Sequence, residues 1–327
     1  MFGPHVNRNH AVGARPSIVD HIEAARGEAL AEAGLAIAAA AIFVGGPKNR
    51  EITLRPAERA PLREYLERTG IRVIAHSSYA ASPWRGDPDA ARFIREELGV
   101  CQEAGVAGLV VHLPKLPVGA VMRYLPRLRN PDAPDVRLYL ETPAVRPAES
   151  HYETPAKLAA LFSAIRAELD PGLDHFGLCV DSAHLWTTGI DLRSYGAADE
   201  WLRGLEAVSD TIPHAAVMLH FNDSQRARGV GPDAHAGLAS GKIWEGFRGR
   251  LGESGVAAFT DYAQRHDTPV ILERKPKEAL RGDYLALRGL VAAAPPAAAA
   301  PPAAGPAAPP AELPAAPPAE LPPASLR

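Results

Sequence analysis

Short apolar segments with the composition of β-strands alternate with longer helical patterns along most of this chain. This alternation is the signature of a parallel sheet whose strands are joined by crossover helices. Eight such strands predict a (β/α)8 TIM barrel, which occupies about 250 residues and fits within the 327 residues present. The expected strands are Gly3–Asn7, Ile37–Val44, Arg72–His76, Gly108–Leu113, Arg137–Glu141, Phe176–Asp181, Ala215–His220 and Pro269–Glu273.

The helical patterns between these strands carry start and stop signals. Several begin with Pro or with a Ser, Thr or Asp cap, as at Ser17, and several finish at a glycine, as at Gly34, Gly70 and Gly105. The loops after expected strands two, three, five and seven are long, and long loops tend to be functional. The expected helices are Ser17–Ala33, Pro56–Thr69, Pro88–Ala104, Thr154–Leu169, Asp199–Ser209 and Lys277–Val291.

The composition changes abruptly after Val291, where the chain becomes rich in Ala and Pro and contains the motif PPAEL twice. Sequence of this kind cannot build a hydrophobic core and favours extended polyproline II. We therefore expect a TIM-barrel domain at residues 1–291 and a disordered appendage at residues 292–327. A short docking segment for an unknown protein is the alternative for this tail.

Composition also bears on compartment and partner. Cys101 and Cys179 lack C-x-x-C spacing, which predicts buried free thiols in a reducing compartment. No apolar run approaches the roughly 18 residues of a membrane span, and no signal peptide precedes the first strand. We expect a soluble intracellular monomer without membrane contact, cytoplasmic or, in a eukaryotic or viral source, nuclear. A formal charge of −3 argues against nucleic-acid binding, although three bound divalent cations would reverse its sign.

The stretch FGLCVDSAHLW, residues 176–186, places Asp181 and His184 three positions apart where an apolar strand ends. In an extended strand this pair would face opposite sides. If the strand ends at Asp181 and the chain turns, both side chains can face one cavity. Enzymes with the TIM-barrel fold carry their active-site residues at such strand ends.

Six consecutive expected strands carry a His, Asp or Glu residue at or next to their carboxyl end. Each one alone has a structural alternative, because a strand His is often a hydrogen-bonded core residue and a Glu is often an ion-pair partner. Together they would place several carboxylates and imidazoles in one buried mouth, which is costly without compensating cations. The sequence therefore predicts a metal site from His76, His112, Glu141, Asp181, His220 and Glu273, with His184, Asp233 and His235 close by.

The types of side chain narrow the choice of metal. Imidazole and carboxylate without thiolate suit zinc, with manganese or iron as competitors. Nine candidates exceed the roughly four ligands of one zinc ion, so we expect two or three ions. Asp233 and His235 are two apart and can chelate one ion with His184, and Glu141 could bridge two ions through its two oxygens.

With these nine residues in place, the chain resembles the endonuclease IV family of apurinic/apyrimidinic (AP) endonucleases over roughly residues 3–276. The resemblance is carried by GPHVNRN, FVGGPKNR, HSSY, VVHLP, LYLETPA, CVDSAHLWTTGIDL, HFNDSQRARGVGPDAHAG and VILERKP. It implies a zinc-dependent enzyme of DNA base excision repair that acts on double-stranded DNA with abasic sites. The expected products of cleavage 5′ to the abasic site are a 3′-hydroxyl and a 5′-deoxyribose phosphate.

The resemblance also implies how three zinc ions, with Mn²⁺ as a substitute, would be held. One would be bound by His76, His112 and Glu141. A second would be bound by Glu141, Asp181, His220 and Glu273, and a third by His184, Asp233 and His235. Glu141, Glu273 and Asp181 would be the catalytic residues, with Glu141 and Glu273 orienting the nucleophile. His5 at the end of the first strand is a candidate to donate to one of these ligands.

The loops above the strand ends are expected to grip DNA, and here the chain departs from the family. Tyr79 is followed by AASPWRGDP, TPAVRPAES follows the strand-five glutamate, and Ala234 stands where the family commonly has a basic residue. Basic and polar side chains in these loops would contact phosphates, which fixes position without base readout. Tyr79 and Trp84 are candidate wedges beside an extruded nucleotide, or core residues. The other candidates are Lys48, Asn49, Arg50, Arg85, Gln225, Arg226 and Arg228.

Three other functions compete with this one. A sugar isomerase or epimerase of the xylose-isomerase-like barrels would need only one manganese at Glu141, Asp181, His220 and Glu273, so counting bound metal separates the two. A related barrel nuclease acting on ultraviolet photoproducts differs in substrate. A barrel without activity, used as a DNA-binding or scaffold module, is disfavoured by the complete set of candidate ligands.

Overall fold

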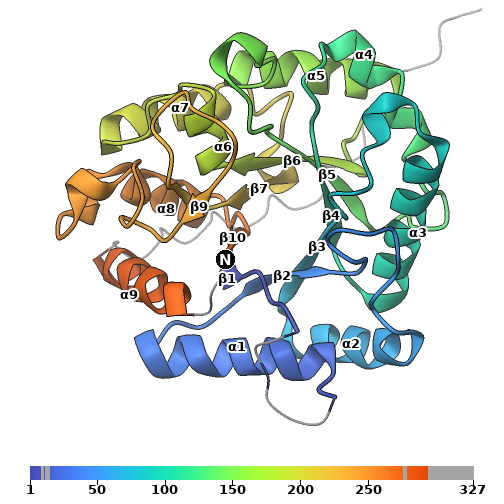
Figure 1. The fold of residues 1–327 in the computed structure, drawn as a ribbon, viewed down its shortest axis with the longest axis horizontal. Coiled ribbons are helices and arrows are strands. Elements are labelled where there is room, and N and C mark those ends of the chain that lie inside the picture. The colour runs from blue at the N-terminus through green and yellow to red at the C-terminus, as the bar shows by residue number, and fades with distance from the viewer. Residues whose placement is uncertain (9–10, 12–14, 275–277, 294–327) are drawn as a thin grey trace, which may run out of the picture. The chain divides into compact units, whose positions relative to one another are not determined.

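A computed structural model describes residues 1–8, 11, 15–274 and 278–293 of the chain. Its main sheet has eight parallel strands in the order β1-β10-β7-β6-β5-β4-β3-β2. A parallel bridge between His5 and Ala41, and the Val6 N–H that donates to the Ala41 carbonyl, join the two edge strands. The sheet therefore closes on itself, with helices around it (Figure 1), and the predicted TIM barrel is confirmed.

Three strands have the predicted bounds and the other five are shorter than predicted. The first strand ends at Pro4 rather than at residue 7, because its register with β10 stops at the pair Pro4–Leu272. The seventh barrel strand starts at Val217, since residues 214–216 form a 3-10 turn. The barrel strands are β1 Phe2–Pro4, β2 Ala39–Phe43, β3 Arg72–His76, β4 Gly108–His112, β5 Arg137–Glu141, β6 Phe176–Asp181, β7 Val217–His220 and β10 Val270–Leu272.

The predicted caps at Ser17, Gly34, Gly70 and Gly105 are formed at the ends of three helices. Ser17 accepts a hydrogen bond from the Asp20 N–H and completes a capping box. Gly34, Gly70 and Gly105 have φ of 62°, 67° and 71°, a left-handed conformation that glycine adopts without strain. The helices are α1 Ile18–Ala33, α2 Pro56–Thr69, α3 Pro88–Ala104, α4 Val118–Met122, α5 Pro155–Glu168, α6 Ser182–Thr187, α7 Tyr195–Glu206, α8 Gly255–Arg265 and α9 Glu278–Ala293.

The prediction placed the start of α7 four residues late and omitted α4, α6 and α8. Ser194 caps α7 through the Ala197 N–H, which begins the helix at Tyr195. The segment of α8 starts with Gly255 and Val256, both weak helix formers. Its stability comes from burial of residues such as Phe259 and Tyr262.

Two apolar layers hold the barrel together. The larger one packs the outer face of the sheet against the helices, and the smaller one fills the barrel interior. Tyr139 belongs to this interior layer, and a Cβ at Gly108 or at Gly177 would come within 2.5 or 2.7 Å of its ring. The absence of a side chain at these two positions is therefore what admits the ring. The interior layer consists of Ala39, Ala41, Ile74, Val110, Tyr139, Cys179, Met218 and Ile271.

Three further expectations concern the cysteines, membrane-spanning segments and the C-terminal tail. Cys101 and Cys179 are both free and buried, as predicted. No helix in the described parts of the chain is both long enough and apolar enough to cross a membrane. The tail predicted for residues 292–327 lies outside the described residues, apart from 292 and 293 at the end of α9.

Candidate metal centre

The side chains inside the barrel form two layers, one above the other along the barrel axis. Residues two apart on a strand face the same side of a sheet, so the position two residues after each interior apolar residue also faces inward. On six strands, β3 to β7 and β10, the residue at or next to the carboxyl end of the strand is ionisable, and these six residues form a second layer there. The pairs are Ile74 and His76, Val110 and His112, Tyr139 and Glu141, Cys179 and Asp181, Met218 and His220, and Ile271 and Glu273.

The pair Asp181 and His184 is arranged by a sharp turn from strand to helix. β6 ends at Asp181, whose Oδ1 accepts the His184 N–H at 2.9 Å and so caps α6. The His184 Nδ1–H donates to the Thr142 carbonyl at 2.7 Å. This bond leaves Nε2 with its lone pair directed into the mouth, which is the usual arrangement of a metal-binding histidine. The predicted turn after Asp181 is confirmed.

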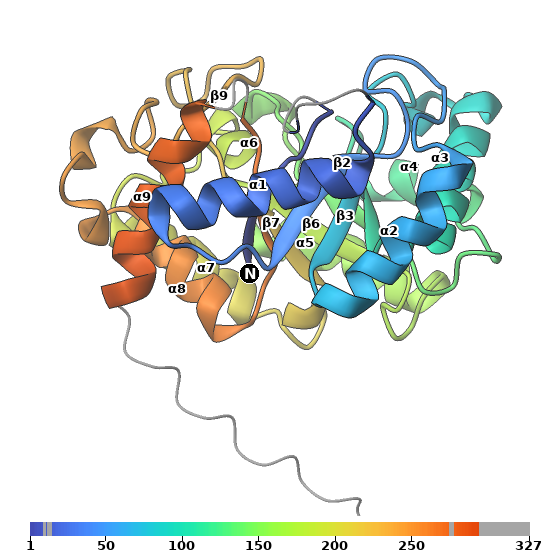
Figure 2. The same cartoon turned by 90° about the horizontal axis from the view of Figure 1, so that it is seen from below.

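Asp233 and His235 reach the mouth from a hairpin that the sequence did not predict. β8, Asp223–Ser224, pairs antiparallel with β9, His235–Ala236, above the strand ends (Figure 2). The carboxylate of Asp223 accepts the N–H groups of Gly241 at 3.1 Å and Ile243 at 2.8 Å. These bonds tie the return of the loop to the base of the hairpin.

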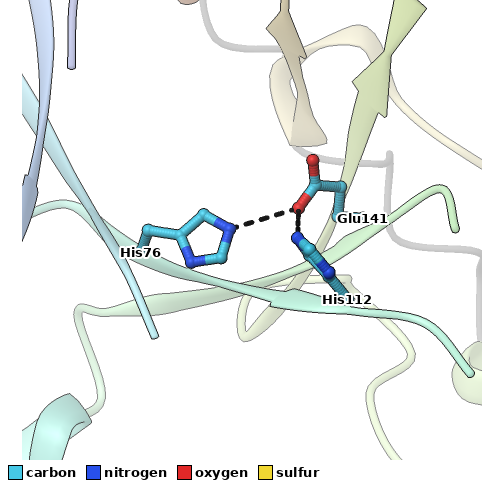
Figure 3. A group of neighbouring side chains, drawn as sticks. All are labelled: His76, His112 and Glu141. Atoms are coloured by element: carbon cyan, nitrogen blue, oxygen red, sulfur yellow. Dashed lines mark hydrogen bonds and ion pairs between the residues drawn. The ribbon is translucent and has the colours of Figure 1, made fainter. Parts of the chain in front are cut away.

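The first group of candidate ligands lies around one oxygen of Glu141 (Figure 3). Nε2 of His112 is 2.8 Å and Nε2 of His76 is 3.4 Å from Oε2 of Glu141. The His76 Nδ1–H donates to the Ser77 carbonyl at 2.7 Å, so its Nε2 is the nitrogen available to an ion. His76 and Glu141 are buried, whereas the His112 side chain is 42% exposed.

The second group lies around the other oxygen of Glu141. Nδ1 of His220 is 2.8 Å from Oε1 of Glu141, 3.4 Å from Oε2 of Glu273 and 4.0 Å from Oδ2 of Asp181. Each oxygen of Glu141 therefore faces a different set of histidines, which is the arrangement that a bridging carboxylate needs. These four residues lie close enough together for one ion.

The third group differs in one respect from the predicted set. Nε2 of His235 is 2.9 Å from Oδ2 of Asp233, and Nε2 of His184 is 3.6 Å from the same oxygen. Oδ2 of Asp181 is also only 3.5 Å from Nε2 of His235. Asp181 thus lies between the second and third groups, because its Oδ1 caps α6 and only Oδ2 faces the mouth. All nine predicted side chains converge, and their role as ligands stays a prediction.

The charges of this layer are coupled. Burial would raise the pKa of Glu141, but His112 and His220 outweigh it and hold that pKa well below its usual value. Burial would lower the pKa of His184, but Asp181 and Asp233 raise it well above the ordinary value. Burial raises the pKa of the Cys179 thiol to about 12, which disfavours the thiolate, the form that binds metals. Imidazoles and carboxylates therefore stay the predicted donors.

The residues predicted to grip DNA lie on exposed loops, several of them in ion pairs. Nη2 of Arg50 is 2.6 Å from Oδ2 of Asp87, and Nη1 of Arg228 is 3.1 Å from Oδ2 of Asp191. The Asn49 amide donates to Glu51 at 3.0 Å and the Gln225 amide to the His235 carbonyl at 2.9 Å. Among the described residues no ion pair is formed by the exposed side chains of Lys48, Arg85 and Arg226.

Two aromatic residues after β3 have different environments. Tyr79 is 51% exposed, and its ring centroid lies 5.1 Å from that of His76. Trp84 is 6% exposed and donates its Nε1–H to the His112 carbonyl at 2.7 Å. The structure therefore gives Trp84 the core role, and of the two it leaves Tyr79 available to a bound molecule.

Two cavities open at the candidate ligands, and Tyr79 lines both. One of about 720 Å³ lies over His5, Phe43, Asp233, His235 and Glu273. The other, of about 460 Å³, lies over His76, Trp84, His112 and Lys115. Since His5 Nδ1 is 3.4 Å from Oε1 of Glu273, His5 contacts a candidate ligand as expected.

Two buried polar residues beside the site were missed by sequence reasoning. Asn222 is fully buried and donates to Asp181 at 2.6 Å. Its position two residues beyond His220, in the motif HFND, was the available signal. Glu97 on α3 is also fully buried and accepts hydrogen bonds from the Ser77 hydroxyl and the Ser78 N–H. It supports the loop after His76, and only the structure shows this contact.

Comparison with known proteins decides the family. Residues 28–283 match the family described as xylose isomerase-like TIM barrel. A "Probable AP endonuclease" of African swine fever virus (isolate Tick/Malawi/Lil 20-1/1983) is 34% identical over 242 residues, covering 74% of this chain and 80% of the viral one. The chain belongs to the endonuclease IV family of AP endonucleases. A "Probable endonuclease 4" of Haloquadratum walsbyi is 30% identical over 134 residues, 41% of this chain and 44% of that protein.

Solved structures agree with this assignment. The crystal structure of AsfvAP:AG superposes with a TM-score of 0.83 at 31% identity, covering 89% of this chain and 99% of that one. Endonuclease IV from Thermus thermophilus has a TM-score of 0.63 at 24% identity, with 89% and 97% covered. A D-tagatose 3-epimerase-like protein has a TM-score of 0.53 at 17% identity, with 85% and 96% covered. The last two likenesses concern the fold alone.

Proposed function

We propose that this protein is a zinc-dependent AP endonuclease of DNA base excision repair. It hydrolyses the phosphodiester on the 5′ side of an abasic site in double-stranded DNA and leaves a 3′-hydroxyl and a 5′-deoxyribose phosphate. The observation that carries the proposal is the convergence of nine imidazole and carboxylate side chains around Glu141. Relatives named AP endonuclease and endonuclease 4 support the substrate class.

The donor set fits three zinc ions. Four carboxylates in one mouth need cations to offset their charge, and the three groups described above each offer three or four imidazole or carboxylate donors, as zinc prefers. His76, His112 and Glu141 would hold one ion, and Glu141, Asp181, His220 and Glu273 a second. His184, Asp233 and His235 would hold the third. When bound, zinc lowers the pKa of water and stabilises negative charge at a phosphate.

The protein's own part in the reaction is to orient water and the scissile bond. Water attacks phosphorus, the bond between phosphorus and the 3′ oxygen breaks, and that oxygen leaves with a proton as the 3′-hydroxyl. Glu273 faces the larger cavity with 11% of its side chain exposed, so it is placed to accept a hydrogen bond from the attacking water. Glu141 and Asp181 are more deeply buried than Glu273 and would hold the ion beside it.

The exposed loops would hold the duplex. Lys48, Arg226 and Arg228 supply positive charge, and Asn49 and Arg50 supply further donors to phosphate oxygens. Tyr79 stands at the rim of both cavities, where it can pack against an abasic nucleotide extruded from the stack. Ala234 offers only its backbone, whose carbonyl accepts the Gln225 N–H. Positive charge for the phosphates would come here from other loop residues.

The test is cleavage of duplex DNA that holds one synthetic abasic analogue. The zinc-loaded protein should cut once, 5′ to the analogue, and Glu273→Gln should lose about a thousandfold or more in rate. Glu67→Gln, on the exposed face of α2, is the matched control and should cut like the wild type. Intact DNA with the wild type, or equal rates for both variants, would end the proposal.

The second group alone could serve a sugar isomerase or epimerase with one divalent ion. The likeness to the epimerase-like protein shows the fold only, whereas the convergence of His76, His112, His184, Asp233 and His235 is not needed for that chemistry. Metal analysis distinguishes the two functions. About three zinc ions per chain support the nuclease, and a single ion with turnover of a ketose supports the isomerase.

A further inference from the structure

Asn222 is a buried amide whose Nδ2 donates to two candidate carboxylate ligands and also lies 3.4 Å from Nε2 of a third candidate, His235. It follows β7, and its side chain has no exposed surface. Its Nδ2 donates to Oδ2 of Asp181 at 2.6 Å and to Oε2 of Glu273 at 3.1 Å. These two oxygens belong to the second group of candidate ligands and both face His220. One side-chain amide therefore links the two carboxylates of this group that come from β6 and from the chain after β10.

The orientation of this amide is fixed by its other end. Oδ1 of Asn222 accepts from Nη1 of Arg274 at 2.6 Å and from the Glu273 N–H at 3.1 Å. A guanidinium and a backbone N–H can only donate, so a flipped amide would place N–H groups against both of them. The donor end is thereby forced towards Asp181 and Glu273.

Arg274 is itself held by the surrounding structure. It is 6% exposed, donates to the Phe221 and Glu273 carbonyls at 3.0 Å each, and forms an ion pair with Asp283 of α9. Asp283 also accepts the Leu238 N–H at 2.6 Å, in the loop that follows His235. The network thus joins the outer helix α9 to the mouth of the barrel, and its guanidinium and carboxylate charges offset each other.

We propose that Asn222, oriented by Arg274, is the positioning residue for the ion bound by Glu141, Asp181, His220 and Glu273. This inference rests on the proposed function for the presence of that ion. The amide donates to one lone pair on each carboxylate, which fixes the direction of the remaining lone pairs. It also holds the two negative charges of Asp181 and Glu273 close together in the absence of an ion. Partners of this kind contribute about 10–100-fold to metal affinity. The first group contains neither Asp181 nor Glu273 and should depend on Asn222 much less.

Two variants separate positioning from folding. Asn222→Asp keeps the shape but replaces the donor by a third negative charge beside Asp181 and Glu273. Asn222→Leu removes the donor without adding charge. Asp170→Asn is the structural control, because Asp170 is a buried carboxylate that accepts the N–H groups of Asp174, His175 and Phe176 before β6.

The full-length proteins are stripped of metal with a chelator and titrated with zinc, and zinc per chain and Tm with and without zinc are measured. We expect about three ions on the wild type and, for Asn222→Leu, one of these ions bound about 10–100-fold more weakly with a smaller rise in Tm on adding zinc. Asn222→Asp also removes the donor but adds a charge that attracts cations, so its zinc affinity should fall less than that of Asn222→Leu. Asp170→Asn should lower both Tm values together and keep the rise. Asn222 variants that keep all zinc affinities and the full rise in Tm would overturn the inference.

The zinc titration, together with the cleavage assay on abasic DNA, separates this inference from the proposed function. A wild type that binds zinc but leaves abasic DNA intact contradicts the nuclease and leaves the Asn222 comparison decisive for the ion. A wild type that binds zinc and cuts DNA, with Asn222 variants that bind zinc equally well, contradicts only the positioning role. A wild type that binds no zinc overturns both.

Discussion

The two inward-facing layers of the barrel use the same strands, the same face and opposite chemistry. The lower layer, with Tyr139 and Met218, is apolar and packed. The upper layer, with Glu141 and His220, lies two residues further along each strand, about 7 Å away, and holds ionisable groups within hydrogen-bond distance of one another. In a closed barrel, one ionisable residue at the end of each of six strands is therefore enough to form a complete site. The lower layer sets the positions, and the upper layer provides the donors.

The largest effect is expected in the upper layer at Glu141. Glu141→Gln keeps the shape of the side chain but removes the charge shared by the first and second groups, so we expect at least two zinc ions to be lost and cleavage to fall by about a thousandfold or more. Zinc per chain and the single-turnover rate measure this. Tyr139→Phe, one step below on the same strand, should retain both properties. Equal zinc content in the two variants would contradict the division between the layers.

The lower layer should respond in stability. Tyr139→Ala leaves an empty space between Gly108 and Gly177, whose backbones cannot fill it, and loss of a large buried aromatic costs about 3–5 kcal/mol. Urea unfolding of the metal-free protein should show this cost as a lower midpoint. A midpoint within experimental error of the wild type would mean that the ring does not support the barrel.

Glu97 is a buried carboxylate that belongs to neither layer. Burial raises its pKa from 4.5 to about 7, opposite to the direction at Glu141. A carboxylate raised in this way stabilises the fold fully below pH 4.5 and loses that contribution as the pH rises through 7. Glu97→Gln imitates the protonated form, so its stability relative to the wild type should improve by about 3 kcal/mol between pH 4.5 and 8. Parallel curves of unfolding free energy against pH would contradict the shift.

The strands and the convergence of the nine candidate side chains could be predicted from sequence because side chains on a barrel strand repeat every two residues, so VVHLP and LYLETP show which positions face inward. The hairpin of β8 and β9 could not, since strands of two residues have no periodicity. Asn222 was missed for another reason: it follows the end of β7, and nothing in the sequence shows that its amide contacts Asp181 and Glu273, 41 and 51 residues away. The pairing of Arg50 with Asp87 likewise depends on how two loops fold over each other.

The smallest effect is expected in the loops above both layers. The ionisable layer contains no Lys or Arg, so the positive charge that binds DNA phosphates must come from these loops. Arg226 has its carbonyl held by the Trp186 Nε1–H at 2.9 Å, and its exposed side chain forms no ion pair with the part of the chain that the structure describes, so it presents a positive charge on an anchored backbone. Arg226→Ala should weaken binding to abasic duplex uniformly across sequences and reduce the slope of log Kd against log salt by about one. Arg92→Ala on α3, whose guanidinium pairs with Asp89, should leave that slope unchanged. Fluorescence anisotropy at several salt concentrations measures it, and equal slopes for both variants would place the DNA away from this loop.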